Sequence, residues 1–308
     1  MVDANTNTVL VLEGGGLRGA FVAGVLAELE RCRSLSFSHI FATSAAAASA
    51  AYLVAGQIDR ALAIWRDKTH GAQLISPRHL LRGRSLMDIE GLVALFQGEL
   101  PLDAGRVERS ATALYVAVTN CNTGAADHVA ATERNLFQLL KATMALPVVY
   151  GRVVDVEGVP YIDGGIADAI PLQAALALDP GRLIVVTTRP IGYRKQRTPL
   201  ASDLLRHNYR SFPALWPALR NRWESYNRSV MKLEALERLG RVEVIRPSGA
   251  LPASRMTRDR GRIIETLELG QRAAAAFLRA EAHGAISGPL GLAHAGSPPE
   301  RAQLEKSA

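Results

Sequence analysis

The feature that most constrains the fold is a buried strand that runs into a glycine turn and then into a helix. Residues 8–13, TVLVLE, are apolar on both faces, which is typical of a parallel strand covered by helices. Three glycines follow at 14–16. In the segment that follows, one helical face carries Leu17, Phe21, Val25 and Leu29. This order of elements favours an α/β fold.

The same alternation continues along the chain. Buried strands are predicted at 38–43, 113–120 and 182–190, and 153–165 alternates like a hairpin that turns at Glu157 and Gly158. Helices are predicted between them, at 45–55, 58–66, 86–97 and 134–145. We therefore expect an α/β fold with a mainly parallel central sheet and helices on both faces.

The character of the chain changes after residue 190. Residues 191–240 are expected to be helical and basic, 242–247 to form one more strand, and 257–282 to form an amphipathic helix. The end of the chain is rich in Gly, Pro, Ser and Ala. We predict an α/β domain at 1–190, a helical C-terminal extension at 191–285 packed on it, and a disordered tail at 286–308.

Composition bears on the cellular location and the partners of the protein. The two cysteines, Cys32 and Cys121, provide neither a disulfide framework nor a metal-ligand cluster, and the N-terminus lacks a signal-peptide pattern. We expect a cytoplasmic protein. The uncharged run 40–56 is at the short limit of a membrane span and is rich in alanine, so a buried strand and helix are favoured there. The net charge of +7 favours anionic partners.

The glycine turn allows two functions. Gly14, Gly16 and Gly19 satisfy G-x-G-x-x-G, but a dinucleotide site also needs an acidic residue at the end of the second strand, and none stands there. Alternatively, backbone N–H groups of such a loop, with the dipole of the helix that follows, hold an anion or a developing oxyanion.

Ser44 stands between the second strand and an alanine-rich helix, in the segment HIFATSAAAASA. By itself it would be an N-cap residue. Beside an oxyanion loop it becomes a candidate nucleophile, because Ala45 would present its N–H at a helix N-terminus. The nucleophile-elbow pattern G-x-S-x-G has glycines where this chain has Ala42 and Ala46.

A serine nucleophile needs a base, and none of the seven histidines stands in a recognisable setting. Asp163 ends a strand and precedes two glycines. By itself it would be a turn residue. A partly buried carboxylate has a raised pKa, and a direct hydrogen bond to the serine Oγ would let Asp163 accept the proton during attack.

The ordered set of glycine loop, serine turn and Asp-Gly-Gly resembles the patatin-like phospholipase family. The match covers about residues 8–190 and includes GGGLRG at 14–19, Ser44, ALP at 145–147 and DGG at 163–165. The segments that follow, at 209–227 and 242–259, look like the C-terminal extension of a bacterial cytoplasmic subgroup. The resemblance implies a three-layer α/β/α patatin-like fold with a mainly parallel central sheet.

The resemblance also implies roles for individual residues. Ser44 would attack the acyl carbonyl of a lipid or phospholipid ester and Asp163 would be the base, with no cofactor and no metal. The oxyanion hole would lie among the N–H groups of Gly14, Gly15, Gly16 and Ala45. Arg18 would bind a phosphate head group or, alternatively, brace the loop through a salt bridge. Ala169 stands where the family often has asparagine.

Three alternatives remain open at this point. The chain could be a lipid-binding pseudoenzyme, because alanine replaces both elbow glycines. It could bind a dinucleotide, or it could be an acyltransferase on a related fold, which would want a histidine partner.

Residues 205–232 are basic and carry Trp216 and Trp223, which predicts either a helix with a solvated arginine face or a peripheral contact with anionic membrane. No nucleic acid partner is expected, because no recognised module accompanies the charge.

Overall fold

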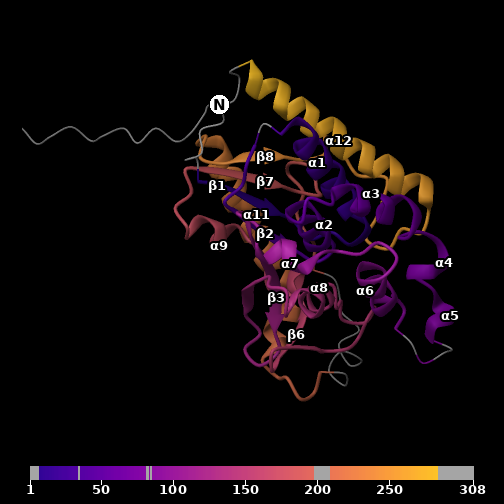
Figure 1. The fold of residues 1–308 in the computed structure, drawn as a ribbon. Helices are drawn as coiled ribbons and strands as arrows, with labels where there is room; N and C mark the ends of the chain where they lie inside the picture. The colour runs from indigo at the N-terminus through magenta and orange to yellow at the C-terminus, as the bar shows by residue number, and fades with distance from the viewer. Residues whose placement is uncertain (1–6, 34, 81–82, 84, 198–208, 284–308) are drawn as a thin grey trace, which may run out of the picture.

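The strands predicted from apolar runs assemble into one sheet in the computed structural model of the chain, which describes residues 7–33, 35–80, 83, 85–197 and 209–283 (Figure 1). Its strands are β1 (Thr8–Leu12), β2 (His39–Thr43), β3 (Ala113–Asn120), β4 (Ala126–Ala130), β5 (Val154–Val156), β6 (Val159–Asp163), β7 (Arg182–Val186) and β8 (Glu243–Ile245). The order is β5-β6-β3-β2-β1-β7-β8, with β4 paired to β3. The central pairs β3-β2, β2-β1, β1-β7 and β7-β8 are parallel, and the hairpin end of the sheet is antiparallel.

Alternation along β1 defines the two faces of the sheet. Leu10 and Leu12 belong to the larger hydrophobic core, whereas Val9 and Val11 belong to a second core on the opposite face. Since successive side chains of a strand point to opposite faces, a strand that is apolar throughout needs helices on both sides. The predicted mainly parallel, three-layer α/β/α fold is therefore confirmed.

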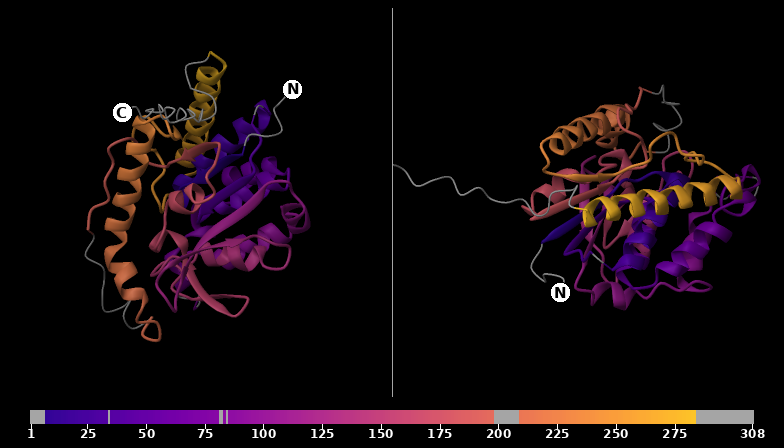
Figure 2. Two further views of the ribbon diagram at one scale, coloured as in Figure 1. Left: turned by 90° about the vertical axis from the view of Figure 1, so that its left-hand side faces the viewer. Right: turned by 90° about the horizontal axis from the view of Figure 1, so that it is seen from above.

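The larger core is covered by helices from the first half of the chain together with the last helix. They are α1 (Gly19–Cys32), α2 (Ala45–Val54), α3 (Ile58–Asp67), α4 (Gly71–Leu74), α6 (Ile89–Gln97), α7 (Ala104–Glu108), α8 (Leu136–Thr143) and α12 (Arg260–Ala282). A short helix, α5 (Pro77–Leu80), stands beside this layer. The second core is covered by α9 (Leu172–Leu176) and the long α11 (Leu215–Arg238), as the two views of Figure 2 show.

The last helix joins the first through a close contact between backbones. A Cβ on Gly24 of α1 would lie 2.0 Å from the Leu267 carbonyl oxygen, and a Cβ on Gly270 of α12 would lie 2.0 Å from that of Phe21. Glycine at both positions therefore lets α1 and α12 approach each other more closely than side chains would allow.

The structure corrects one element prediction. The helix expected throughout 191–240 is found only at Leu215–Arg238, and residues 191–197 and 209–214 are turns and irregular chain. Pro213 precedes α11, and a proline disfavours helical geometry in the residue before it. Residues 198–208 and the predicted tail at 286–308 lie outside the described residues. Across the described part of the chain, no helix combines the length and apolar character of a membrane span.

Candidate active site

Ser44 forms a strained turn between β2 and α2. Its backbone has φ 57° and ψ −136°, a conformation that costs a residue with a side chain on the order of 1–3 kcal/mol. Its N–H donates to Thr143 Oγ1 at 2.8 Å, and the Thr143 hydroxyl donates to the Ala117 carbonyl at 2.6 Å. Nothing in the sequence singles out Thr143, which links the turn to α8 and β3.

The two alanines that replace the elbow glycines fit this geometry. Ala42 lies in β2 and Ala46 in α2, both fully buried, and neither has a positive φ. The left-handed conformation is confined to Ser44 itself. Glycine is required only where φ is positive or where no space exists for a methyl group, so alanine permits the elbow to form.

Asp163 lies directly against the serine. The Ser44 hydroxyl donates to Asp163 Oδ2 at 2.8 Å, and Oδ1 accepts the Gly165 N–H at 2.8 Å. The Asp163 carboxyl is 2% exposed. Burial raises its pKa, while Arg222 and the two hydrogen bonds oppose that rise. The result is a carboxylate that is more basic than a surface aspartate and already bonded to the hydroxyl proton.

Of the four N–H groups predicted to line an oxyanion hole, those of Gly14, Gly15 and Gly16 belong to the glycine loop and that of Ala45 to the start of α2. The N–H groups of Gly15, Gly16 and Ala45 have no backbone hydrogen-bond partner among the described residues. The prediction for Gly14 is wrong, because its N–H donates to the Ala169 carbonyl at 3.0 Å. Gly14 is therefore a structural member of the loop.

Two pockets meet at Ser44, and Gly16, Ser44 and Leu146 line both. The first is about 590 Å³ and apolar, and its wall includes Ile64, Trp65, Leu92, Phe96 and Met144. The second is about 440 Å³ and polar, and it contains Asp163 and the glycine loop.

Arg18 lines the polar pocket, as expected for a group that meets a head group. It is 5% exposed, and its Nε donates to Thr188 Oγ1 at 3.4 Å. The alternative of a bracing salt bridge is not seen, since no ion pair of Arg18 occurs within the described residues. Burial lowers the pKa of its guanidinium to about 10, so it stays charged at neutral pH.

Several polar residues around Ser44 had no signal in the sequence. Lys195, Arg222, Tyr226 and Arg255 line the polar pocket, although each comes from beyond residue 190. Of the two tryptophans expected at a membrane interface, Trp216 packs against a buried cluster that contains Cys121 and Ile162. Residues 205–208 of that basic segment lie outside the described chain. Among the described residues, no group of three or more His, Cys, Asp or Glu is placed to hold a metal ion.

Comparison with known proteins identifies the family of the chain. The family model described as patatin-like phospholipase matches residues 10–176, more than half of the chain. The chain therefore belongs to the patatin-like phospholipase family. A second family model, a domain of unknown function (DUF6363), matches residues 212–283.

Two known proteins are similar to it. The uncharacterized protein YjjU of Escherichia coli K12 is 33% identical over 184 residues, which cover 59% of this chain and 52% of that protein. The chain thus spans about half the length of this curated relative. VipD from Legionella pneumophila, a solved structure, matches with a TM-score of 0.48 and 13% identity over 89% of this chain and 67% of that one.

Proposed function

We propose that the protein is a serine lipid acyl hydrolase that cleaves carboxylic esters of lipids through an acyl-Ser44 intermediate. The observation that carries the proposal is the 2.8 Å hydrogen bond from Ser44 Oγ to Asp163 Oδ2, on a strained turn where two pockets meet. Membership of the patatin-like phospholipase family supports a lipid substrate.

In the first half of the reaction, Ser44 Oγ attacks the acyl carbonyl and its proton passes to Asp163 Oδ2. The carbonyl oxygen becomes an oxyanion that accepts hydrogen bonds from the N–H groups of Gly15, Gly16 and Ala45. When the intermediate collapses, the bond to the alcohol oxygen breaks and Asp163 returns the proton to that oxygen. The alcohol leaves and the acyl group remains on Ser44.

In the second half, water takes the place of the alcohol. Asp163 accepts a proton from the water as it attacks the acyl-serine carbonyl, and the same donors hold the second oxyanion. Collapse releases the fatty acid and returns the proton to Ser44. Apart from the ester and water, no group outside the chain is needed in either half, so we infer that no cofactor or metal takes part in this chemistry.

The two pockets divide the substrate between them. The apolar pocket suits the acyl chain, because its wall is made of aliphatic and aromatic side chains. The polar pocket suits the alcohol side of the ester, where Arg18 lies. Ser44 lines both pockets, so the reacting carbonyl would lie at their junction.

The test is hydrolysis of a short-chain ester and of a phospholipid by paired variants. Ser44→Ala and Asp163→Asn should each lower kcat/KM by roughly three or more orders of magnitude, as loss of a catalytic-triad member does in serine hydrolases. Ser38→Ala, at the other end of β2, and Asp168→Asn, which keeps the polar contact to His128, are the matched controls. Turnover that survives in Ser44→Ala would reject the proposal, and an inactive wild type would favour a lipid-binding pseudoenzyme.

We also infer that residues 191–285 form a C-terminal extension on a catalytic domain at 1–190. Pairing of β8 with β7 and the packing of α12 on α1 support this division. A chain ending at residue 190 should aggregate, because it would expose the face of α1 that carries Gly24. Recovery of a stable, active 1–190 fragment would argue against it.

We also propose a cytoplasmic location with peripheral contact on anionic membrane, and the positive charge of the chain supports the membrane contact. The net charge is +7, and Arg228 and Arg238 are exposed on α11. Sedimentation should carry the protein down with phosphatidylglycerol vesicles and not with phosphatidylcholine vesicles, and added salt should release it. Equal binding to both kinds of vesicle would contradict the contact.

A further inference from the structure

The polar pocket beside Ser44 is lined by more basic than acidic side chains. It is lined by five basic side chains and two carboxylates: Arg18, Arg189, Lys195, Arg222 and Arg255, with Glu13 and Asp163. The carboxylates are already engaged. Glu13 accepts the Thr188 N–H at 2.5 Å and the Tyr226 hydroxyl at 3.0 Å, while Asp163 binds Ser44 and Gly165.

None of the five basic groups forms an ion pair with a carboxylate of the described residues. Arg222 Nε donates only to the Gly165 carbonyl, at 2.9 Å. Burial lowers the pKa of Arg222 and that of Arg18 to about 10. Since a buried charge without a counter-ion is unfavourable, the pocket is built for an anion that the chain itself does not supply.

Four of the five basic groups lie outside residues 10–176, the part matched by the patatin-like family model. Arg222 and Arg255 lie inside the second matched region, at 212–283. Arg255 lies over the glycine loop: its carbonyl accepts the Leu17 N–H at 3.2 Å, and a Cβ on Gly16 would lie 2.6 Å from its Cγ. The C-terminal part of the chain thus forms most of the charged wall.

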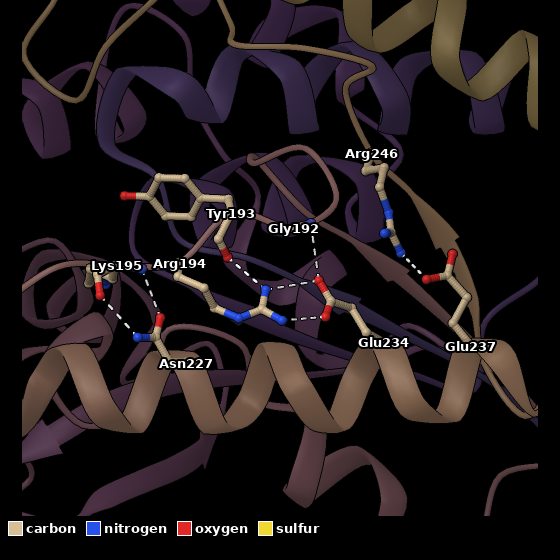
Figure 3. A network of polar contacts seen from close by, with 8 residues as sticks. All are labelled: Gly192, Tyr193, Arg194, Lys195, Asn227, Glu234, Glu237 and Arg246. Carbon is tan, nitrogen blue, oxygen red and sulfur yellow. Dashed lines mark hydrogen bonds and ion pairs between the residues drawn. The ribbon is translucent and has the colours of Figure 1, made fainter.

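Lys195 is held in place by a segment that we call the strap, residues 192–195, which runs along α11 (Figure 3). The Lys195 N–H donates to Asn227 Oδ1 at 2.8 Å and its carbonyl accepts from Asn227 Nδ2 at 3.0 Å. About two turns further along α11, Glu234 accepts from Arg194 at 2.5 Å and from the Gly192 N–H at 3.1 Å. The strap therefore fixes the backbone from which Lys195 enters the pocket.

The aromatic side chains of the pocket are not available to a quaternary ammonium group. The Arg189 guanidinium lies 4.2 Å from the centre of the Tyr193 ring, and Lys195 Nζ lies 4.1 Å from that of Tyr226. A choline head group is usually bound by free aromatic faces, and here each ring already carries a cation of the protein. The remaining charge would repel it.

We propose that Lys195, Arg222 and Arg255 make the polar pocket a specificity subsite for a phosphate-bearing head group with net negative charge. The protein then prefers anionic phospholipids to zwitterionic ones. This inference rests on the proposed function, because it takes the alcohol side of the ester to occupy this pocket. Guanidinium and ammonium groups match phosphate oxygens through charge-assisted hydrogen bonds.

The test is calorimetric binding to the full-length Ser44→Ala protein, which should leave substrates intact. The probes are lysophosphatidylglycerol and lysophosphatidylcholine of one chain length, glycerol 3-phosphate, and inorganic phosphate. We expect the anionic lysolipid to bind at least about tenfold more tightly than the choline lipid, the effect of one charge-assisted hydrogen bond. Adding Arg222→Gln or Lys195→Gln should remove most of that preference, and Arg222→Lys should restore part of it.

Arg220→Gln is the matched control, since Arg220 stands two residues from Arg222 on α11 and is exposed. Equal affinity for the two lysolipids, or an equal loss in Arg220→Gln, would overturn the subsite. Inorganic phosphate binding as tightly as the anionic lysolipid would overturn the assignment to a lipid head group. Turnover by Ser44→Ala would instead reject the proposed hydrolase and leave any anion preference intact.

Discussion

The two pockets that meet at Ser44 are built from different parts of the chain. Every residue that lines the apolar pocket lies between Gly16 and Leu146, inside the region matched by the patatin-like family model. The polar pocket draws on residues from Glu13 to Arg255, including four basic groups from beyond residue 176. One pocket belongs to the family domain and the other is shared with the C-terminal part.

This difference teaches where specificity is expected to reside. An apolar wall distinguishes acyl chains by size and shape, and it does so with differences of only a few kcal/mol. A wall of partly buried basic groups without ion-pair partners distinguishes ligands by charge, an effect that is stronger where less water is present. Changes in the C-terminal part should alter head-group preference, and changes in the family domain should alter acyl preference or the chemistry itself.

Outside the catalytic pair, the largest effect should come from Gly16, because it lines both pockets. It has φ +58°, and a Cβ there would lie 2.6 Å from Arg255 Cγ and 2.7 Å from its carbonyl oxygen. Gly16→Val should lower kcat/KM by roughly 100-fold or more for every ester, since it moves an oxyanion donor and the Arg255 segment together. The control is Gly151→Ala, where φ is +73° but a Cβ meets open space. A Gly16→Val protein that loses only one of the two preferences would break the comparison.

The next effect should fall on the acyl side alone. Ala48 of α2 faces the apolar pocket. Ala48→Leu should fill part of that pocket and lower the ratio of kcat/KM for long-chain over short-chain esters by roughly tenfold, the range seen when hydrophobic pockets discriminate by a few methylenes. The ratio for anionic over choline lipids should stay the same. A change in that second ratio would show that the pockets are not separate.

On the charged side, the affinity for anions should depend on pH. Burial, followed by the cations Arg222 and Arg255, lowers the pKa of Lys195 to about 6, with a further contribution from Arg18 and an opposing one from Glu13. An anion binds better to the protonated ammonium, so affinity should be highest below this pKa and fall as the pH rises through it. Calorimetry with lysophosphatidylglycerol between about pH 5 and 8 should show a fall of roughly several-fold.

Lys195→Met should flatten this dependence. Lys232→Met is the control, because Lys232 is an exposed residue of α11 that bonds Gln173 at 2.7 Å. A pH dependence that persists in Lys195→Met would assign the titration to another group.

Stability should respond at the catalytic pair. The pKa of Asp163 is raised in the folded chain, so the fold binds its proton more readily than the unfolded chain does, and the ionised group lowers stability above both pKa values. Asp163→Asn should therefore raise Tm at neutral pH by roughly a few degrees, and the gain should shrink in acid. Thermal unfolding at pH 7 and pH 4 measures it, and a lower Tm at pH 7 would contradict the direction of the shift.

The smallest effect should come from strain at Ser44. Glycine adopts φ 57° without the cost that a side chain brings. The free energy of unfolding of Ser44→Gly should therefore exceed that of Ser44→Ala by about 1 kcal/mol, which denaturant unfolding measures. Equal stability of the two variants would mean that the turn stores no strain.

The sequence predicted the catalytic side of the site better than the charged side. Local patterns indicated β1, β2 and β6, and therefore placed Ser44 and Asp163 at strand ends. Lys195 and Arg255 lie in irregular chain, far from Ser44 in sequence, and no periodicity or motif marks which basic residues will line the pocket.

Two further points needed backbone geometry. Gly14 belongs to the same glycine run as Gly15 and Gly16, but its amide is used by the Ala169 carbonyl. Whether Ala42 and Ala46 permit an elbow depended on the sign of φ at each, which a residue type does not fix. In the first case the outcome is set by a neighbour more than 100 residues away in sequence, and in the second by the backbone dihedral angles of the two alanines.

The central claim, that Ser44 is a nucleophile activated by Asp163, is tested most directly by labelling with a fluorophosphonate followed by peptide mass spectrometry. The account predicts one adduct, on Ser44, formed by the wild type and by Asp168→Asn and formed at least about 100-fold more slowly by Asp163→Asn. An unlabelled Ser44 in folded wild-type protein, or labelling that is unchanged in Asp163→Asn, would contradict it.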